Sequence, residues 1–175
     1  MTKNIALIGF MGTGKSTVSH YLGKRMGLEE IEIDEMIVKA EGMPITDLFA
    51  KFGEAYFRDC ESKAIQKLQD KKKAVISCGG GAVIREENVI NLKKSSWIVL
   101  LDASPETILA RVKDSTKRPI LNGHMNVEYI SGLMEKRRSL YERAADIKIV
   151  TDQKSVEAVC QEMLSMLSKL DGAES

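Results

Sequence analysis

The chain has 175 residues, of which 43% are hydrophobic and 29% charged, so it is long enough for an ordinary globular domain with a substantial core. Its formal net charge of +1 at pH 7 provides no bulk attraction to nucleic acid or to an anionic membrane. No apolar run approaches the roughly 20 residues of a membrane span. We therefore expect neither a nucleic-acid partner nor a membrane partner.

No internal repeat, linker or low-complexity tract interrupts the chain, which indicates a single domain over residues 1–175. Cys60, Cys78 and Cys160 are far apart, odd in number and without metal-type spacing. Together with the lack of a signal segment before "NIALIGF", they predict a protein of a reducing compartment, the cytoplasm. The small net charge and the lack of an obvious exposed apolar stripe favour a monomer.

In chain order, short apolar runs bounded by Gly, Asp or Ser alternate with amphipathic segments of helical period. The alternation predicts an α/β fold with a parallel sheet and helices on both faces. Ligands of such sheets bind beyond the carboxyl ends of the strands. The expected strands are 5–10, 31–34, 74–78, 97–102 and 147–150, and the expected helices include 16–27, 54–69, 104–113 (with Ser104 as N-cap and Pro105 at its first position) and 155–170.

The stretch "GFMGTGKS", from Gly9 to Ser16, follows the first expected strand and opens the first expected helix. It fits the phosphate-binding pattern G-x-x-x-x-G-K-[ST], whose backbone N–H groups and helix N-terminus bind phosphate. Lys15 can reach the β- and γ-phosphates, and the Ser16 hydroxyl can ligate Mg²⁺. The motif predicts an ATP site that includes Gly12, Thr13, Gly14, Lys15, Ser16 and Thr17, with Mg²⁺ as cofactor.

Among P-loop proteins, a guanine-specific GTPase would carry an Asn-Lys-x-Asp motif after a later strand, and this chain has none. A motor or larger ATPase would need more chain. A small kinase remains, together with the hypothesis of a nucleotide-binding regulatory protein that has kept the fold without turnover. Within the kinases, a polyol kinase such as one for gluconate is the alternative acceptor class.

The chain resembles the shikimate kinase family over nearly its whole length. The resemblance implies transfer of the ATP γ-phosphoryl to the 3-hydroxyl of shikimate, on the route to chorismate and the aromatic amino acids. It implies a three-layer α/β/α P-loop kinase fold with strand order 2-3-1-4-5, an acceptor-binding region at about 34–61 and a mobile lid at about 113–126. The matching blocks are "GFMGTGKST" (9–17), the aspartate of "IEIDEMI" (34), "FGEAYFRDCE" (52–61), "GGGAV" (79–83), "KRPIL" (117–121) and "RRSLYERAAD" (137–146).

The resemblance also implies the residues of the acceptor site. Asp34 would hydrogen-bond the acceptor hydroxyl, either as a base or as an orienting group, and capping of the following helix is its alternative role. Arg58 and Arg137 would clamp the shikimate carboxylate. Glu61 would orient Arg58 through an i, i+3 ion pair, with plain surface pairing as the alternative. The backbone of Gly79, Gly80 and Gly81 would lie against shikimate, so that a Cβ at Gly80 or Gly81 would occupy substrate volume; the other interpretation is a tight turn without a ligand.

On the ATP side, the resemblance gives Arg118 in the lid a charge-neutralising role at the transferring group, so that Lys15, Asp34 and Arg118 are the expected catalytic residues. Arg111 would stack on adenine, and Gln153 or its neighbour Lys154 would face the base. Glu32 stands where the family usually has a metal-site aspartate. We expect Glu32 to keep this role beside Ser16, since a water-mediated contact tolerates one additional methylene.

Overall fold

The computed structural model describes residues 3–113 and 126–173. The elements, in chain order, are β1 (Asn4–Ile8), α1 (Lys15–Met26), β2 (Glu29–Glu32), α2 (Ile33–Glu41), α3 (Ile45–Gln66), β3 (Ala74–Ser77), the 3₁₀ helix η1 (Ala82–Ile84), α4 (Glu86–Ser95), β4 (Ser96–Asp102), α5 (Pro105–Val112), α6 (Val127–Ala144), β5 (Ile147–Val150) and α7 (Val156–Ala173).

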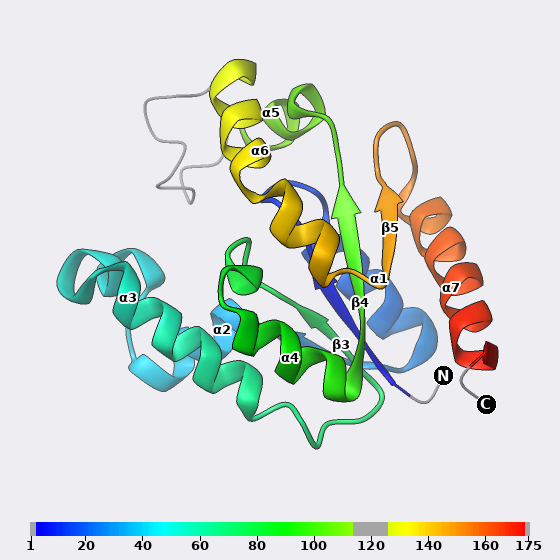
Figure 1. Ribbon diagram of the computed structural model, residues 1–175, viewed down its shortest axis with the longest axis horizontal. Coiled ribbons are helices and arrows are strands. Elements are labelled where there is room, and N and C mark those ends of the chain that lie inside the picture. The colour runs from blue at the N-terminus through cyan, green and yellow to red at the C-terminus, as the bar shows by residue number, and fades with distance from the viewer. Residues whose placement is uncertain (1–2, 114–125, 174–175) are drawn as a thin grey trace.

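The strands form one parallel sheet in the order β2-β3-β1-β4-β5, which confirms the expected order (Figure 1). β1 lies at the centre, where Ala6 pairs with Ile76 of β3 and with Ile98 of β4. All five residues of β1 are buried because helices cover both faces, which explains why the strand is apolar from Ile5 to Ile8. The carboxyl ends of β1 and β3 are therefore adjacent, and these ends carry the P-loop and the glycine triplet.

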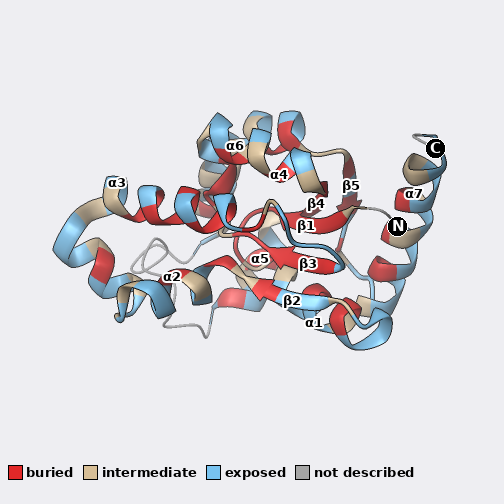
Figure 2. Cartoon of the chain, turned by 90° about the horizontal axis from the view of Figure 1, so that it is seen from below, coloured by how far each residue is buried: buried red, intermediate tan, exposed pale blue. Residues whose placement is uncertain are grey.

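Successive residues of the central strands point into two cores on opposite faces of the sheet. Figure 2 shows the buried strands lying between helices on either side of the sheet. Ile5 and Leu7 of β1 pack with residues of α1 and α7, including Leu22 and Met163. On the other face, Ala6 and Ile8 belong to the core formed with α2, α3, α4, α5 and α6. Because both cores share one sheet, we propose that the chain is a single domain.

The Ser104 cap is confirmed: its hydroxyl accepts a 3.2 Å hydrogen bond from the Thr107 amide, with Pro105 at the start of α5. The expected strand at 5–10 ends earlier, at Ile8, because Gly9 has φ 140° and turns the chain into the P-loop. The expected helix at 54–69 is the second part of α3, which begins at Ile45 and is interrupted by non-helical backbone at Gly53.

The expected strand at 31–34 is displaced, because β2 ends at Glu32 and the chain is helical from Ile33. Asp34 therefore lies in the first turn of α2 and not at the end of a strand. The N-cap of α2 is Glu32, whose side chain makes no capping hydrogen bond, so the interpretation of Asp34 as an N-cap is wrong.

All three cysteines are buried and unpaired. No helix in the described part of the chain combines the length and the hydropathy needed to cross a membrane.

Candidate active site

The P-loop connects β1 to α1 at the carboxyl edge of the sheet. A Cβ at Gly9 would overlap the carbonyl oxygen of Leu101 at the end of β4, so the close approach of these two strand ends requires glycine. The Lys15 ammonium donates hydrogen bonds to the carbonyl oxygens of Gly9 (2.8 Å) and Phe10 (2.9 Å). No side chain caps α1, because its N-cap is Gly14, and the first residues of the helix line a cavity.

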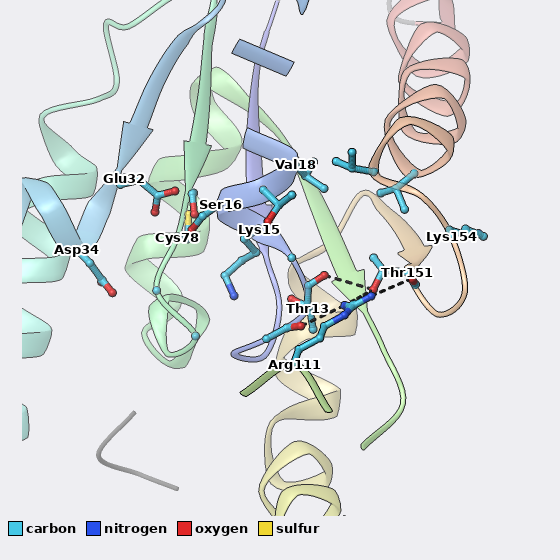
Figure 3. A pocket seen from close by; sticks show the side chains of 18 residues that line it. Thr13, Lys15, Ser16, Val18, Glu32, Asp34, Cys78, Arg111, Thr151 and Lys154 are labelled. Atoms are coloured by element: carbon cyan, nitrogen blue, oxygen red, sulfur yellow. Dashed lines mark hydrogen bonds between the residues drawn. The ribbon is translucent and has the colours of Figure 1, made fainter. Parts of the chain in front are cut away.

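This cavity has a volume of about 540 Å³ and lies along the carboxyl ends of the strands (Figure 3). In the close view, Glu32 and Asp34 lie on one side of Lys15, and Arg111, Thr151 and Lys154 lie on the other. One cavity therefore brings together predicted ATP and metal positions with three of the predicted acceptor positions, Asp34, Gly79 and Gly80. Its predicted members are Gly12, Thr13, Gly14, Lys15, Ser16, Thr17, Glu32, Asp34, Gly79, Gly80 and Arg111.

The half-buried carboxylate of Glu32 lies between two hydroxyl groups at the cavity wall. The side-chain hydroxyls of Ser77, the last residue of β3, and of Ser16 in the P-loop both act to lower the pKa of this carboxylate. Burial raises the pKa of Glu32 above its ordinary value, and the two hydroxyl groups partly offset this rise. Ser16 and Glu32 thus form the oxygen-rich corner that was expected to hold a metal ion, and Ser77 is a third member that sequence reasoning missed.

The glycine triplet between β3 and η1 is closely surrounded by side chains. A Cβ at Gly79 would lie 2.9 Å from Glu61 Oε1 and 3.1 Å from Asp34 Oδ1, and a Cβ at Gly81 would overlap the Arg58 guanidinium. In this structure Gly81 makes room for the Arg58 guanidinium, and the expectation that a Cβ at Gly81 would occupy substrate volume stays a prediction. A Cβ at Gly80 would be in ordinary van der Waals contact with its nearest atoms, at 3.7–3.9 Å, so only this member of the triplet could accept a methyl group without a shift of its neighbours.

The amide groups of the triplet provide hydrogen-bond donors at this edge of the cavity. Within the described residues, the N–H groups of Gly79, Gly80 and Gly81 donate no hydrogen bond to a protein acceptor, although the carbonyl groups of Gly79 and Gly81 accept bonds in the following turn. Buried or half-buried amide groups are nearly always paired in folded proteins. Three consecutive amide groups without a protein partner indicate a surface prepared for the oxygen atoms of a ligand.

Arg58 is held in place beside the triplet by acidic residues of its own helix. Its side chain is 9% exposed, and its Nη1 lies 2.8 Å from Oε2 of Glu61, whose side chain is fully buried at 0% exposure. Its Nη2 lies 3.1 Å from Oε1 of Glu54. Burial raises the pKa of Glu61, and the Arg58 charge acts in the opposite direction. The expected i, i+3 pair is therefore present, and it is a buried pair, not a surface pair.

Arg137 reaches the triplet from α6, on the side of the sheet that carries α3 and α4. Its Nη1 donates a 3.2 Å hydrogen bond to the carbonyl oxygen of Gly80, which also accepts a hydrogen bond from the Tyr141 hydroxyl. Arg58, Arg137 and Gly81 are not on the wall of the main cavity; they lie directly behind its glycine edge.

Arg111 connects the P-loop to the loop after β5. It donates to the Gly12 carbonyl (3.1 Å) and to the Thr151 hydroxyl (3.1 Å) and carbonyl (3.2 Å). Lys154 lines the cavity, whereas Gln153 is not among its lining residues. The structure thus brings Lys154, and not Gln153, to the side expected for adenine. Arg118 and most of the expected lid lie outside the described residues.

Sequence reasoning missed several wall residues because no motif marks them. Ser77 and Cys78 had one available signal, their position at the carboxyl end of an expected strand. Tyr141, which contacts the Gly80 carbonyl and does not line the cavity, had no signal beyond its place in the last matching block. The remaining missed wall residues are Val18, Thr151, Val156 and Val159.

The chain was compared with known proteins. The family model for shikimate kinase matches residues 11–168. A shikimate kinase of Thermodesulfovibrio yellowstonii is 42% identical over 173 residues, covering 99% of both chains. Among solved structures, a shikimate kinase from Acinetobacter baumannii in complex with shikimate has a TM-score of 0.90 and 31% identity, covering 97% of this chain and 94% of that one. A shikimate kinase from Aquifex aeolicus has a TM-score of 0.80 and 39% identity, covering 94% and 96%.

These matches extend across the sheet, the P-loop, the glycine triplet and α6, so they include every part of the site described above. The family model matches most of the chain, and a relative of this identity matches nearly its whole length. The similarity is therefore not a chance resemblance of the P-loop alone. The chain belongs to the shikimate kinase family.

Proposed function

We propose that this chain transfers the γ-phosphoryl group of ATP to the 3-hydroxyl of shikimate, giving shikimate 3-phosphate and ADP. The observation that carries the proposal is the cavity lined together by the P-loop, Asp34, Gly79 and Gly80, the two glycines having amide groups without an acceptor among the described residues. Phosphoryl transfer requires a donor phosphate and an acceptor hydroxyl in line, with positive charge around the transferring group. A cavity lined by both sets of groups meets that requirement.

On the donor side, the P-loop amide groups and Lys15 would bind the β- and γ-phosphates. Arg111 would lie against adenine, Lys154 would face the same side, and Arg118 would neutralise charge on the transferring group. This arrangement supports a nucleoside triphosphate as the donor. The apolar wall residues Val156 and Val159 are suited to the flat, weakly polar face of a base.

The residues present fit a magnesium ion that accompanies ATP. Mg²⁺ prefers oxygen ligands and is usually held by one or two protein groups together with substrate phosphates and water. Ser16 and Glu32 provide such oxygen atoms, and both residues line the same cavity. In the described residues no group of three or more His, Cys, Asp or Glu side chains could hold a metal alone. When bound, Mg²⁺ would neutralise charge on the phosphate oxygens, and Ser16 and Glu32 would hold it at the P-loop.

On the acceptor side, Arg58 and Arg137 would bind the carboxylate of shikimate through planar guanidinium groups. Arg58 enters this role already oriented, because Glu61 and Glu54 hold its guanidinium. Asp34 would accept a hydrogen bond from the 3-hydroxyl and orient it toward the γ-phosphate. A loose phosphoryl-transfer transition state needs little base strength, so orientation is sufficient for this step.

Three unpaired buried thiols are typical of a protein of a reducing compartment, and we propose that the reaction takes place in the cytoplasm.

The first experiment measures ADP release by the purified chain with Mg·ATP in the presence of shikimate, of gluconate or of no acceptor. Strong stimulation by shikimate alone is expected. Stimulation by gluconate would transfer the proposal to a polyol kinase, and ATP binding without stimulation by either acceptor would indicate a regulatory protein.

A further inference from the structure

Two side chains of α6 share one backbone oxygen of the glycine triplet. The hydroxyl of Tyr141 and the Nη1 of Arg137 both donate to the Gly80 carbonyl. The two residues are one helical turn apart and so project from the same face of α6. Gly80 itself lines the cavity, so these contacts connect α6 to the edge at which the acceptor would bind.

Tyr141 is the more rigid of the two donors. Its side chain is 5% exposed and belongs to the core beneath α6, whereas Arg137 is only half-buried. Burial raises the pKa of the Tyr141 phenol, so the hydroxyl remains a donor at neutral pH. The Tyr141 ring thus places a fixed donor at the Gly80 carbonyl. Arg137 uses one N–H group at the same carbonyl, and its other N–H groups remain available for a ligand.

The geometry of a peptide bond transmits this contact to the donor groups of the triplet. The Gly80 carbonyl and the Gly81 N–H belong to one planar trans peptide, so they point in opposite directions. A carbonyl held toward α6 therefore turns the Gly81 amide away from α6. That amide has no acceptor among the described residues, and neither do the amide groups of Gly79 and Gly80.

We propose that Tyr141 is a positioning residue of the acceptor site. Its hydroxyl fixes the Gly80–Gly81 peptide, and through the shared carbonyl it also fixes the guanidinium of Arg137. The inference rests on the proposed function for the identity of the acceptor. It deepens that function by assigning the orientation of the acceptor-binding backbone to a residue that does not itself touch the substrate.

The test is Tyr141→Phe, which removes the hydroxyl and keeps the ring. One hydrogen bond of this kind corresponds to about a 3- to 10-fold change in an equilibrium constant. We expect the dissociation constant and KM for shikimate to rise by that factor, with the KM for ATP changed less than twofold. Tyr21→Phe is the matched control, because Tyr21 lies on α1 and its hydroxyl contacts only Arg25 among the described side chains.

A purely structural role would lower the melting temperature without separating the two substrates. Equal effects on shikimate and ATP, or no effect on either, would overturn the inference. An amide NMR spectrum of the unliganded protein provides a readout that needs no turnover: the Gly81 resonance should shift in Tyr141→Phe and not in Tyr21→Phe. Unchanged triplet resonances would also overturn the inference. Failure of the wild-type chain to use shikimate would instead contradict the proposed function, and the NMR result would still decide whether Tyr141 orients this peptide.

Discussion

Replacement of Gly81 by alanine tests how the triplet and Arg58 depend on each other. Gly81 has φ −109°, which alanine can adopt, so the substitution causes no backbone strain. Its new methyl group would overlap the Arg58 guanidinium, and we expect the guanidinium to shift away from Glu61, which lies 2.8 Å from it in the wild type. Gly80→Ala adds the same methyl group where the nearest atom is 3.7 Å away, and it is the matched control for stability.

The expected loss of stability follows from Glu61, which is fully buried. Separating a buried ion pair leaves an uncompensated charge and costs about 3–5 kcal/mol. Alanine returns about 0.4–1 kcal/mol by restricting the unfolded chain, so the net loss is about 2–4 kcal/mol. For a chain of this size, that loss lowers the melting temperature by roughly 5–15 °C. Displacement of Arg58 from the carboxylate of shikimate should raise the KM for shikimate about 10- to 150-fold.

The pH dependence gives an independent check with a definite sign. Burial raises the pKa of Glu61 above 4.5, and Arg58 acts against this rise, so displacing Arg58 should raise the pKa further. A carboxyl group whose pKa is higher in the folded chain than in the unfolded chain contributes stability at a pH below its unfolded pKa. This contribution is lost as the pH rises through its folded pKa. The deficit of Gly81→Ala should therefore shrink from pH 8 to pH 5. The prediction is wrong if thermal melts at pH 8 show Gly81→Ala to be as stable as Gly80→Ala and if the KM of Gly81→Ala for shikimate stays within twofold of the wild-type value.

Arg137→Lys should raise the KM for shikimate far more than the KM for ATP, because lysine lacks the planar fork; equal increases in steady-state kinetics would contradict the carboxylate role. Arg118→Ala, at a position outside the described residues, should lower kcat by about 10³-fold while calorimetry still detects shikimate binding, and unchanged turnover would remove Arg118 from catalysis. Glu32→Gln should raise the Mg²⁺ concentration for half-maximal turnover about 10- to 100-fold and weaken Mn²⁺ binding measured by electron paramagnetic resonance; an unchanged metal requirement would place the metal elsewhere.

Features that depend on residues close in sequence could be predicted from the sequence. The P-loop needs a particular order of glycine, lysine and serine, and the cap at Ser104 needs only the residues that follow it. The pairing of Arg58 with Glu61 follows from a spacing of one helical turn. Alternation of apolar runs and helical segments was sufficient for a parallel α/β sheet, because few topologies can accommodate that alternation.

Contacts between distant segments were decided only by the tertiary structure. Tyr141 meets the Gly80 carbonyl across a separation of 61 residues, and Arg111 meets the Gly12 carbonyl across 99. The sequence indicated that the triplet needs bare backbone. Only the packing of its neighbours reveals that Gly81 makes room for Arg58, whereas Gly80 has room for a methyl group. The physical reason is that spacing along one element determines which of its residues share a face, whereas the neighbour of that face depends on how the crossovers stack the elements.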